Sequence, residues 1–555
     1  SSDVCSSDLM SRLRSGNRIG EFLKEGTKSL SGLEEAVLRN IEACKDLQRI
    51  TRTSLGPNGM NKMVINHLEK LFVTNDAGTM LHELEVQHPA AKMLVLAAHM
   101  QEEEFGDATN ICVIFGGELM EQAENLIRMG LHPADVVAGY EKAHEKLQEL
   151  LPTLYQRQVK DVHDENELSM LMMPVVGSHQ PGMEYVIAPL VARACLNVMP
   201  KKVVSKFNLD NVRVCKVLGA SVADSFVVNG MVIPHRKPDG VLVNMEKCRV
   251  AVFQNGVDLA ATETKGTVLI QNASQLKEFS IGEENTLDTI IKSIADTGVN
   301  VIISGSAVGE LALHYCQKYG ILLLRIPSKF EMRRVCRLTG AIAQLKLEAP
   351  APDAIGSCSA VSLLEVGSTP CTVFRQDDEL ARVSTIVLRG SAMNIMDDVE
   401  RAVADAAATC KAVCLSDNLG LLPGGGAAEI SLYSALSDYA ATLPGLDQYA
   451  VAKYAESLMA IPRSLAENGG KDSSAVVSSL LAASTRGEKT MGVSSAPDTD
   501  LDDMVAAQIW DLGCTKAHAL RLATDAAITV LRVDQIIMSK PAGGLKDKPV
   551  RPEDD

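Results

Sequence analysis

The segment Leu422-Pro423-Gly424-Gly425-Gly426 leads directly into a predicted helix over residues 427–436, close to the C-terminal end of the 555-residue chain. Three successive glycines let the backbone lie against a flat or anionic ligand, because no Cβ stands in the way. A flexible loop is the simpler interpretation. A Walker phosphate loop is excluded, since no Gly-Lys-Ser/Thr follows.

A similar arrangement lies towards the other end of the chain, where Gly106-Asp107-Ala108-Thr109-Asn110 opens an apolar helix predicted over residues 111–127. The first turn of a helix presents free amides and the positive end of the helix dipole, so it can hold phosphates. An adjacent carboxylate can hold Mg²⁺, which keeps several waters and uses few protein ligands. The simpler alternative is that Asp107 only caps the helix.

Two shorter segments carry weaker signals. Leu55-Gly56-Pro57-Asn58-Gly59 follows a long predicted helix, and its glycines allow a tight turn whose amides can approach an anion. Thr74-Asn75-Asp76-Ala77-Gly78-Thr79 follows the β-like residues 71–73, and an aspartate among small residues and hydroxyls suits a metal or a water molecule. Taken alone, each segment is more simply a turn, the second with an Asx bond.

A further carboxylate, Asp405, lies on a predicted helix whose buried stripe includes Val399, Val403 and Ala407. Asp405 falls outside this stripe, and an i,i+4 ion pair with Arg401 is the simpler interpretation. The alternative is a carboxylate that orients the attacking water in a phosphoryl transfer.

The composition limits the class of protein. A chain of 555 residues is too long for one core, so we expect about three domains. Hydrophobic residues make up 46% and charged residues 22%, as in ordinary globular proteins, while only 4% aromatic residues favours helix-rich packing. The net charge of −16 argues against a nucleic-acid ligand, since that affinity comes largely from Lys and Arg.

Cysteine usage and hydropathy favour a reducing compartment and no membrane partner. The 13 cysteines are scattered without a Cys-x-x-Cys pair, so we expect buried free thiols. No apolar stretch approaches the roughly 18–20 residues of a membrane span, and residues 93–100 are interpreted as a short core helix. Residues 1–9 lack the features of a signal peptide and are interpreted as an artefact of cloning or sequence assembly.

Periodicity predicts helices at both ends of the chain. A capping box at residues 31–34 precedes an apolar stripe that continues to Leu47, and a second helix is predicted over residues 133–151. From Asp397 to Lys540 the chain is again predicted to be helical, although residues 528–538 fit a buried helix or a closing strand. The tail 541–555 is rich in Gly, Pro and charge and is predicted to be disordered.

The middle of the chain has α/β character. Short β-rich runs occur at residues 212–217, 226–228, 250–253, 299–303 and 321–326. A predicted helix over residues 311–318 separates the last two runs, which is the alternation typical of an α/β domain. The two helical parts then form either separate domains or one domain that the middle interrupts.

The order and spacing of the motifs resemble the group II chaperonins. LGPNGM (55–60), TNDAGT (74–79), GDATN (106–110), the run STIVLRGS…DDVERAVADA (384–406) and LLPGGGAAE (421–429) occur in the family's order, and the resemblance covers residues 10–544. It implies that the middle is an insertion. The implied parts are a mostly α equatorial domain (1–155 and 413–540), an α/β apical domain with a lid protrusion (221–377) and a small α/β intermediate domain (156–220 and 378–412).

The resemblance also implies a function. Group II chaperonins are ATP-dependent, Mg²⁺-requiring chaperones of the cytoplasm, in which paralogous subunits form a double ring that closes around unfolded clients such as actin and tubulin. An alternative is a ring subunit that binds nucleotide with little or no hydrolysis of its own. A free-standing metabolic ATPase is disfavoured, because no small-molecule specificity pocket is suggested by the sequence.

Site residues carried over from the family fall on the motifs above. The resemblance places Leu55, Gly56, Pro57 and Gly59 in a phosphate loop, makes Asp107 the magnesium ligand, and brings Ala108, Thr109 and Asn110 to the nucleotide phosphates. It assigns Asp76 and Asp405 to the hydrolytic water, and Gly424, Gly425 and Asp511 to the adenosine end. Asp405 would reach the site from the intermediate domain when the domains close.

Two positions depart from the family pattern. Ala108 stands where the family has Gly, and Asn58 stands where a Lys is frequent. A positive φ at residue 108 would cost Ala about 1–2 kcal/mol of strain, whereas an ordinary first-turn conformation would make Ala harmless. We expect the ordinary conformation, and slow but real hydrolysis, since all three carboxylates remain.

The central segment is expected to contact clients. The predicted helix over residues 311–318 mixes Leu, His, Tyr, Gln and Lys, which suits varied partly folded chains, although an ordinary amphipathic helix fits equally well. Residues 261–279 fall where the family has its lid protrusion, and they are polar with scattered Leu and Ile.

Overall fold

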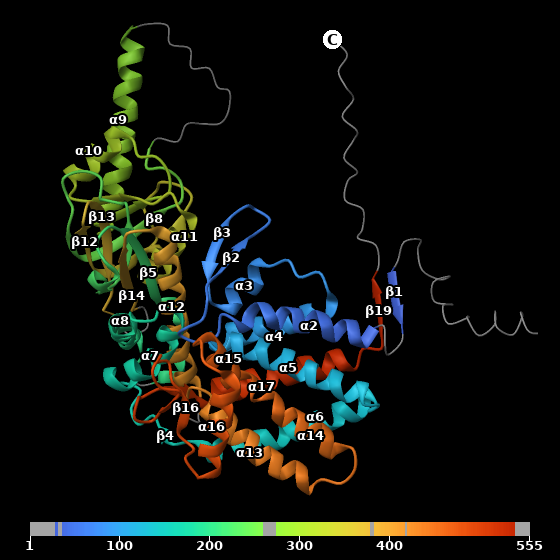
Figure 1. The fold of residues 1–555 in the computed structure, drawn as a ribbon. Coiled ribbons are helices and arrows are strands. Elements are labelled where there is room, and N and C mark those ends of the chain that lie inside the picture. Colours follow the sequence, from blue (N-terminus) through green and yellow to red (C-terminus); the bar gives the residue numbers. More distant parts are fainter. Residues whose placement is uncertain are drawn as a thin grey trace, which may run out of the picture.

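The computed structural model describes residues 28–31, 36–201, 203–258, 273–377, 382–416 and 419–538. Figure 1 shows a helical body, a long helix that rises from it, and an α/β part at the far end. Among the described residues, no helix combines the length and the apolarity that a membrane span requires. Every cysteine in these ranges is free and most are buried, as predicted.

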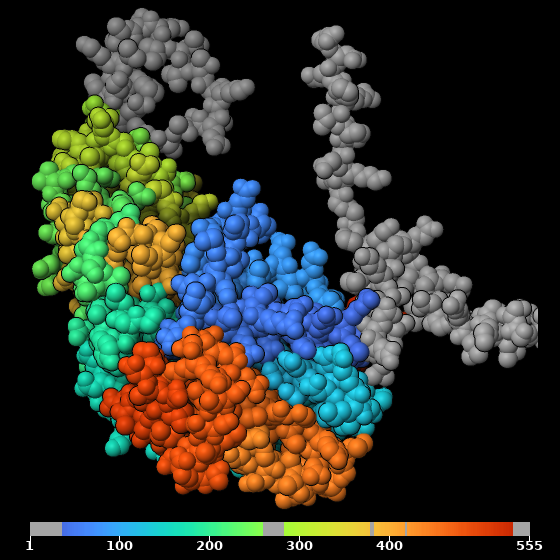
Figure 2. All heavy atoms as spheres, viewed as in Figure 1, coloured from blue at the N-terminus to red at the C-terminus, as the bar shows by residue number. Residues whose placement is uncertain are grey.

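Helices from both ends of the chain share one hydrophobic core. The N-terminal contributors are α2 (Leu38–Arg52), α4 (Pro89–Phe105), α5 (Thr109–Arg128) and α6 (Pro133–Leu150). The C-terminal ones are α13 (Ala427–Thr442), α14 (Asp447–Ser457) and α17 (Gly513–Leu531). Figure 2 shows the blue N-terminal and the orange and red C-terminal segments in one body. The helical parts are therefore not separate domains.

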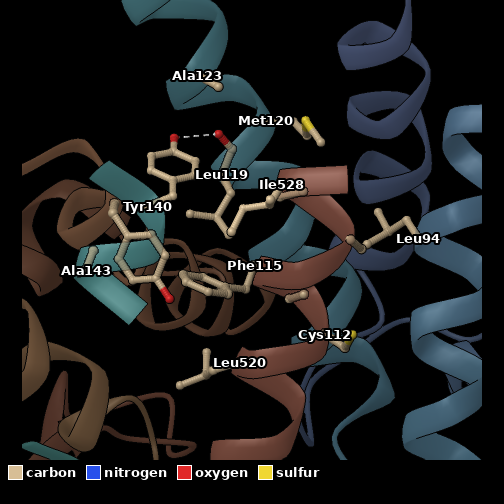
Figure 3. Close-up of a cluster of buried hydrophobic side chains, with 14 of the residues drawn as sticks. Leu94, Cys112, Phe115, Leu119, Met120, Ala123, Tyr140, Ala143, Leu520 and Ile528 are labelled. Carbon is tan, nitrogen blue, oxygen red and sulfur yellow. Dashed lines mark hydrogen bonds between the residues drawn. The ribbon is translucent and has the colours of Figure 1, made fainter. Parts of the chain in front are cut away.

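The centre of this core is built around α5. Phe115 of α5 packs edge-on against Tyr454 of α14, and Leu520 and Ile528 of α17 lie close by (Figure 3). The buried Tyr140 hydroxyl donates to the Leu119 carbonyl at 2.9 Å, which satisfies a polar group that burial would otherwise penalise.

The middle of the chain contains the predicted α/β domain. Its sheet has the order β10-β9-β8-β12-β13-β7, with β11 beside β8. The strands are β7 (Met231–Pro234), β8 (Met245–Phe253), β9 (Val301–Ser304), β10 (Leu322–Arg325), β11 (Ala343–Gln344), β12 (Gly356–Val366) and β13 (Thr369–Arg375). The helices are α9 (Ala273–Asp296), α10 (Glu310–Lys318) and α11 (Lys329–Thr339).

Helices cover both faces of the parallel strands β8, β9 and β10. Val250 and Val252 of β8 pack with α11 on one face, while Ala251 and Phe253 pack with α9 and α10 on the other. A strand buried on both faces needs a continuous apolar run, which is why residues 250–253 were recognisable in the sequence.

A smaller sheet connects the α/β domain to the helical body. Its strands, in the order β5-β14-β6, are β5 (Val212–Leu218), β6 (Phe226–Asn229) and β14 (Ser384–Gly390). Helices α7 (Glu165–His179), α8 (Glu184–Val198) and α12 (Met393–Leu415) pack with it in one cluster. The long helix α12 runs from this sheet down to the helical body (Figure 1).

The remaining elements are short. They are β1 (Lys28–Ser31), β2 (Lys62–Ile65), β3 (Leu71–Thr74), α3 (Ala77–Glu83), β4 (Arg157–Gln158), β15 (Gly420–Pro423), α15 (Ala460–Asn468), α16 (Ser473–Thr485), β16 (Met491–Val493), β17 (Leu501–Asp503), β18 (Trp510–Leu512) and β19 (Gln535–Met538). Strand β1 pairs with β19, so residues near both ends of the chain meet again.

Several sequence predictions need correction. Ser31 lies in β1, and residues 32–35, which hold the rest of the predicted capping box, lie outside the described residues. The stretch 397–540 is mostly helical, but short strands interrupt it. The stretch 528–538 is neither one helix nor one strand, because α17 ends at Leu531 and β19 starts at Gln535.

Other predictions are confirmed in part or fall outside the described ranges. Residues 93–100 are helical, but only one side is core, since Met93, Leu96 and Met100 are exposed. Three predictions fall wholly or mostly outside the described residues: those for residues 1–9, for the tail 541–555 and for the expected lid segment 261–279. The last part of the lid segment, from Ala273, begins α9.

Candidate functional site

A cavity of about 750 Å³ opens where the helical body meets α7 and α12. Of the residues predicted for the site, those lining this cavity are Leu55, Gly56, Pro57, Asp76, Asp107, Ala108, Thr109, Asn110, Asp405, Gly425 and Asp511. Gly59 and Gly424 are not among the lining residues. The fold therefore brings motifs from both ends of the chain to one cavity, together with a carboxylate from the connecting helix.

The start of α5 forms one wall of the cavity. The residue at the helix cap is Ala108, and no side chain caps the first turn, so the prediction that Asp107 caps α5 is wrong. The carboxylate of Asp107 accepts a hydrogen bond from the Ala108 amide at 2.6 Å. Burial raises the pKa of Asp107 above its usual value, and its ionised form would be favoured by a bound cation.

Ala108 has a φ of +67°, so the expectation of an ordinary first-turn conformation is wrong. The chain leaves α4 through Gly106, also at positive φ, and must reverse sharply before α5 starts. In this reversal residue 108 takes the left-handed conformation. Ala108 therefore carries about 1–2 kcal/mol of strain beside the cavity.

Replacing Ala108 with Gly should raise stability by about 0.5–1 kcal/mol, because relief of strain exceeds the entropy that Gly adds to the unfolded chain. The midpoint of thermal unfolding measures this effect. Ala138→Gly, in the regular helix α6, is the matched control and should lower stability by about 1 kcal/mol. A lower midpoint for Ala108→Gly would contradict the strain.

The loop 55–59 is held in place by α15. The Asn468 side chain donates to the carbonyl oxygens of Arg52 and Leu55, at 3.0 and 2.9 Å. Asn58 donates to the Ser495 carbonyl at 3.3 Å, so it ties this loop to the loop after β16. A Cβ on Gly59 would lie 2.3 Å from the Ser54 carbonyl oxygen, which explains why Gly is needed behind the cavity wall.

Asp76 caps α3 at the cavity edge. Its carboxylate accepts from the Gly78 and Thr79 amides, at 3.0 and 2.7 Å, so the Asx-type bond expected for this turn is present. The Thr109 hydroxyl also donates to Asp76, at 3.2 Å. Asn110 accepts from the Ala77 amide at 2.8 Å. The side chains of Thr109 and Asn110 thus fix α3 against α5, and their backbone amides open the helix.

Asp405 does not pair with Arg401, and the simpler interpretation of this carboxylate is wrong. Arg401 pairs with Asp398 at 3.1 Å, whereas Asp405 pairs with His179 at 3.0 Å. Burial raises the pKa of Asp405 to about 7 despite this partner. Burial alone would lower the pKa of His179, but Asp405, Asp76 and Asp107 together raise it to about 9.

A buried ion-pair triad also lines the cavity. Lys516 of α17 lies 2.7 Å from Glu429 of α13 and also pairs with Asp511 of β18. Lys516 and Glu429 are almost fully buried, and Asp511 is partly exposed. Burial alone would lower the pKa of Lys516, but Asp511 and Glu429 raise it above its usual value. Next to this triad, Gly425 has a φ of +60°, which favours Gly.

Sequence reasoning missed Asn468, His179 and Lys516, which all hold parts of the site. Asn468 lies at the end of α15 and His179 at the end of α7, and only tertiary structure connects them to the motifs. Lys516 follows Asp511 by five residues, and this short spacing was the available signal.

Comparisons with known proteins agree on one family. The model of the TCP-1/cpn60 chaperonin family matches residues 47–541. T-complex protein 1 subunit theta from Homo sapiens is 50% identical over 527 residues, which is 95% of each chain. The proteins of the same name from Dictyostelium discoideum and Arabidopsis thaliana are both 49% identical, over 96% and 95% of this chain and 98% and 95% of their own. The chain therefore belongs to the TCP-1/cpn60 chaperonin family.

Proposed function

We propose that this chain is an ATP-hydrolysing subunit of a hetero-oligomeric, double-ring chaperonin that works in the cytoplasm. The observation that carries the proposal is the cavity, where an uncapped helix start, two glycine-containing loops from opposite ends of the chain and three carboxylates meet. Paralogous subunits would complete the ring. Hydrolysis would close a chamber around unfolded clients such as actin and tubulin.

The domain division follows the cores. The shared core of the N- and C-terminal helices supports an equatorial domain of residues 1–155 and 413–540. The cluster of α7, α8 and α12 supports an intermediate domain of residues 156–220 and 378–412, and the large sheet supports an apical domain of residues 221–377.

The cavity suits a magnesium–nucleotide complex. Phosphates would lie against the first-turn amides of α5 and the loop 55–59, where the helix dipole favours anions. The enclosed carboxylate of Asp107 fits Mg²⁺, which prefers oxygen ligands and keeps several waters and phosphate oxygens. When bound, Mg²⁺ would neutralise charge on the phosphates. The adenosine end would lie by Gly424, Gly425 and Asp511, next to the triad.

Hydrolysis needs a group that orients water and takes its proton. Asp405 lines the cavity, and a pKa of about 7 lets the carboxylate accept a proton near neutral pH. The water oxygen would bond to the γ-phosphorus as the bond to the β–γ bridging oxygen breaks, with the water proton passing to Asp405. ADP and phosphate are then the products. Asp76, fixed by two amides and a hydroxyl, would help to position the water.

The alternative, a ring subunit that binds nucleotide with little hydrolysis, rests on the strained Ala108 and on Asn58 in place of a cation. The geometry favours hydrolysis, because both Asp76 and Asp405 line the cavity. Single-turnover hydrolysis separates the two functions when it is measured in assembled particles whose paralogous subunits carry hydrolysis-deficient sites, so that only this subunit can turn ATP over.

Client contacts are proposed for the apical domain. On α10, Leu311 is exposed, as the mixed composition of this helix suggested. On α11, Phe330 is 73% exposed, and the exposed Arg333, Arg334 and Arg337 follow it on the same helix. An exposed apolar side chain among cations suits partly folded chains of acidic character.

Replacing Asp107 with Ala tests the nucleotide site. The sole tryptophan, Trp510, lines the cavity, so its fluorescence should report ATP binding by the purified chain. We expect the substitution to weaken Mg²⁺-dependent ATP binding about 10- to 100-fold and to abolish the magnesium dependence. Asp46→Ala, on exposed α2 surface, is the control. Unchanged, magnesium-dependent binding in the Asp107 variant would refute this site.

A further inference from the structure

His179, the last residue of α7, connects two elements that the proposed hydrolysis requires. Its Nε2 lies 3.0 Å from Oδ2 of Asp405 on α12. Its Nδ1 lies 3.1 Å from Oδ1 of Asn75, in the loop that leads from β3 to Asp76. The ring lines the cavity and is only 10% exposed. No motif considered above assigns a role to it.

The surrounding hydrogen bonds fix how the ring is used. The Asn75 side-chain nitrogen donates to the Ser178 carbonyl at 2.7 Å, so its Oδ1 must be the atom that faces His179. An amide oxygen only accepts, and Nδ1 of His179 therefore carries a proton. Nε2 is then the ring nitrogen that faces Asp405, and it shares a proton with the Asp405 carboxylate. Burial of the ring opposes its charged form, but the negative charges of Asp405, Asp76 and Asp107 outweigh burial and favour the imidazolium.

In this arrangement one carboxylate oxygen of Asp405 binds His179, and the other oxygen is available for a further hydrogen bond. Among the residues that the structure describes, Oδ2 is paired with His179, and Oδ1 has no hydrogen-bond partner. A carboxylate fixed by a ring at one oxygen presents the second in a defined direction. In other active sites, a third group orients the catalytic base through a hydrogen bond in the same way.

We propose that His179 is a positioning residue, which holds Oδ2 of Asp405 and so aims Oδ1 at the attacking water. The inference rests on the proposed role of Asp405. Because the same ring also binds Asn75, it fixes the distance between Asp405 and the loop that carries Asp76. Both carboxylates proposed for the water are thus set by one side chain.

Other hydrogen bonds near His179 would remain after the ring is removed. Gln180 donates to Asp398 of α12, and Arg401 donates to the Val73 carbonyl at 3.4 Å. These bonds also join α7 and α12 to their neighbours. Removing the ring should therefore release Asp405 without separating the two elements.

The experiment measures ATP hydrolysis and ATP binding at this subunit with His179→Ala, in assembled particles whose paralogous subunits carry hydrolysis-deficient sites. The rate constant should fall about 10- to 100-fold, while KM changes less than about 2-fold, since the lost interaction acts only on the transition state. His163→Ala is the matched control, because His163 pairs with Asp161 at an exposed position. If the His179→Ala variant does not assemble, His179→Gln replaces it in the experiment, because Gln is closer to His in volume.

A double-mutant cycle with Asp405→Ala separates the possible failures. His179→Ala should cause no further loss of hydrolysis rate in the Asp405→Ala background, because both changes remove the same interaction between His179 and Asp405. A further loss of equal size, or a raised KM at an unchanged rate constant, would overturn the role of His179. If Asp405→Ala slows hydrolysis and His179→Ala does not, this inference alone fails. If Asp405→Ala has no effect, the proposed role of Asp405 fails first.

Discussion

Replacing Asp405 with Ala is expected to slow ATP hydrolysis by about 100-fold or more and to leave ATP binding nearly unchanged. A positioned general base contributes about 10²–10⁴ to a rate, and Asp405 is the carboxylate that α12 brings to the cavity. Its pair with His179 shows that the side chain is directed inward and not towards Arg401. The rate of a single turnover of radiolabelled ATP measures the effect at this subunit, in assembled particles whose paralogous subunits carry hydrolysis-deficient sites.

The control lies on the same helix. Asp397 is partly exposed and pairs with Lys216 outside the cavity, so Asp397→Ala should hydrolyse ATP at the unmodified rate. Asp405→Asn removes the charge at almost constant volume and should behave like Asp405→Ala. Hydrolysis at the unmodified rate by both Asp405 variants would remove Asp405 from the mechanism.

Replacing Lys516 with Met should cause the largest loss of stability. Lys516 is 3% exposed and Glu429 is fully buried, so the substitution would leave a carboxylate buried without its cation. Breaking a buried ion pair in this way costs about 3–5 kcal/mol. For a domain of this size, the loss corresponds to a fall of roughly 6–10 °C in the midpoint of thermal unfolding.

Two further variants separate charge burial from packing. Lys516→Met combined with Glu429→Gln should recover part of the loss, since no buried charge then remains. Lys142→Met breaks an exposed pair with Asp447 and should leave the midpoint almost unchanged. A single Lys516→Met variant that unfolds at the unmodified midpoint would contradict the triad as a structural element of the site.

Local patterns in the sequence predicted much of the fold. The helix over residues 133–151 and the apolar runs near 250, 301 and 322 are confirmed, because periodicity and burial on both faces are local properties. The pairing of β1 with β19, in which Ser31 lies opposite Gln535, was not predicted, and the capping box at residues 31–34 stays a prediction because residues 32–35 lie outside the described ones. That pairing depends on residues at the far end of the chain.

The site was predictable as a set of motifs but not as a set of contacts. The sequence marked Asp76, Asp107 and Asp405, and all three line one cavity. Two predictions were wrong: the ion-pair partner of Asp405 and the φ of Ala108. The position of α7 decides the first, and the reversal between α4 and α5 decides the second. Such properties depend on tertiary structure and leave no periodic trace in the sequence.

We propose that motifs from both ends of the chain form one nucleotide site that Asp405 completes. An electron cryo-microscopy map of the assembled particle with ADP and a γ-phosphate transition-state mimic tests it most directly. We expect nucleotide density between the start of α5, the loop 55–59 and Gly425, with the mimic beside Asp405. Density for nucleotide elsewhere on this subunit, or an empty cavity at saturating nucleotide, would contradict it.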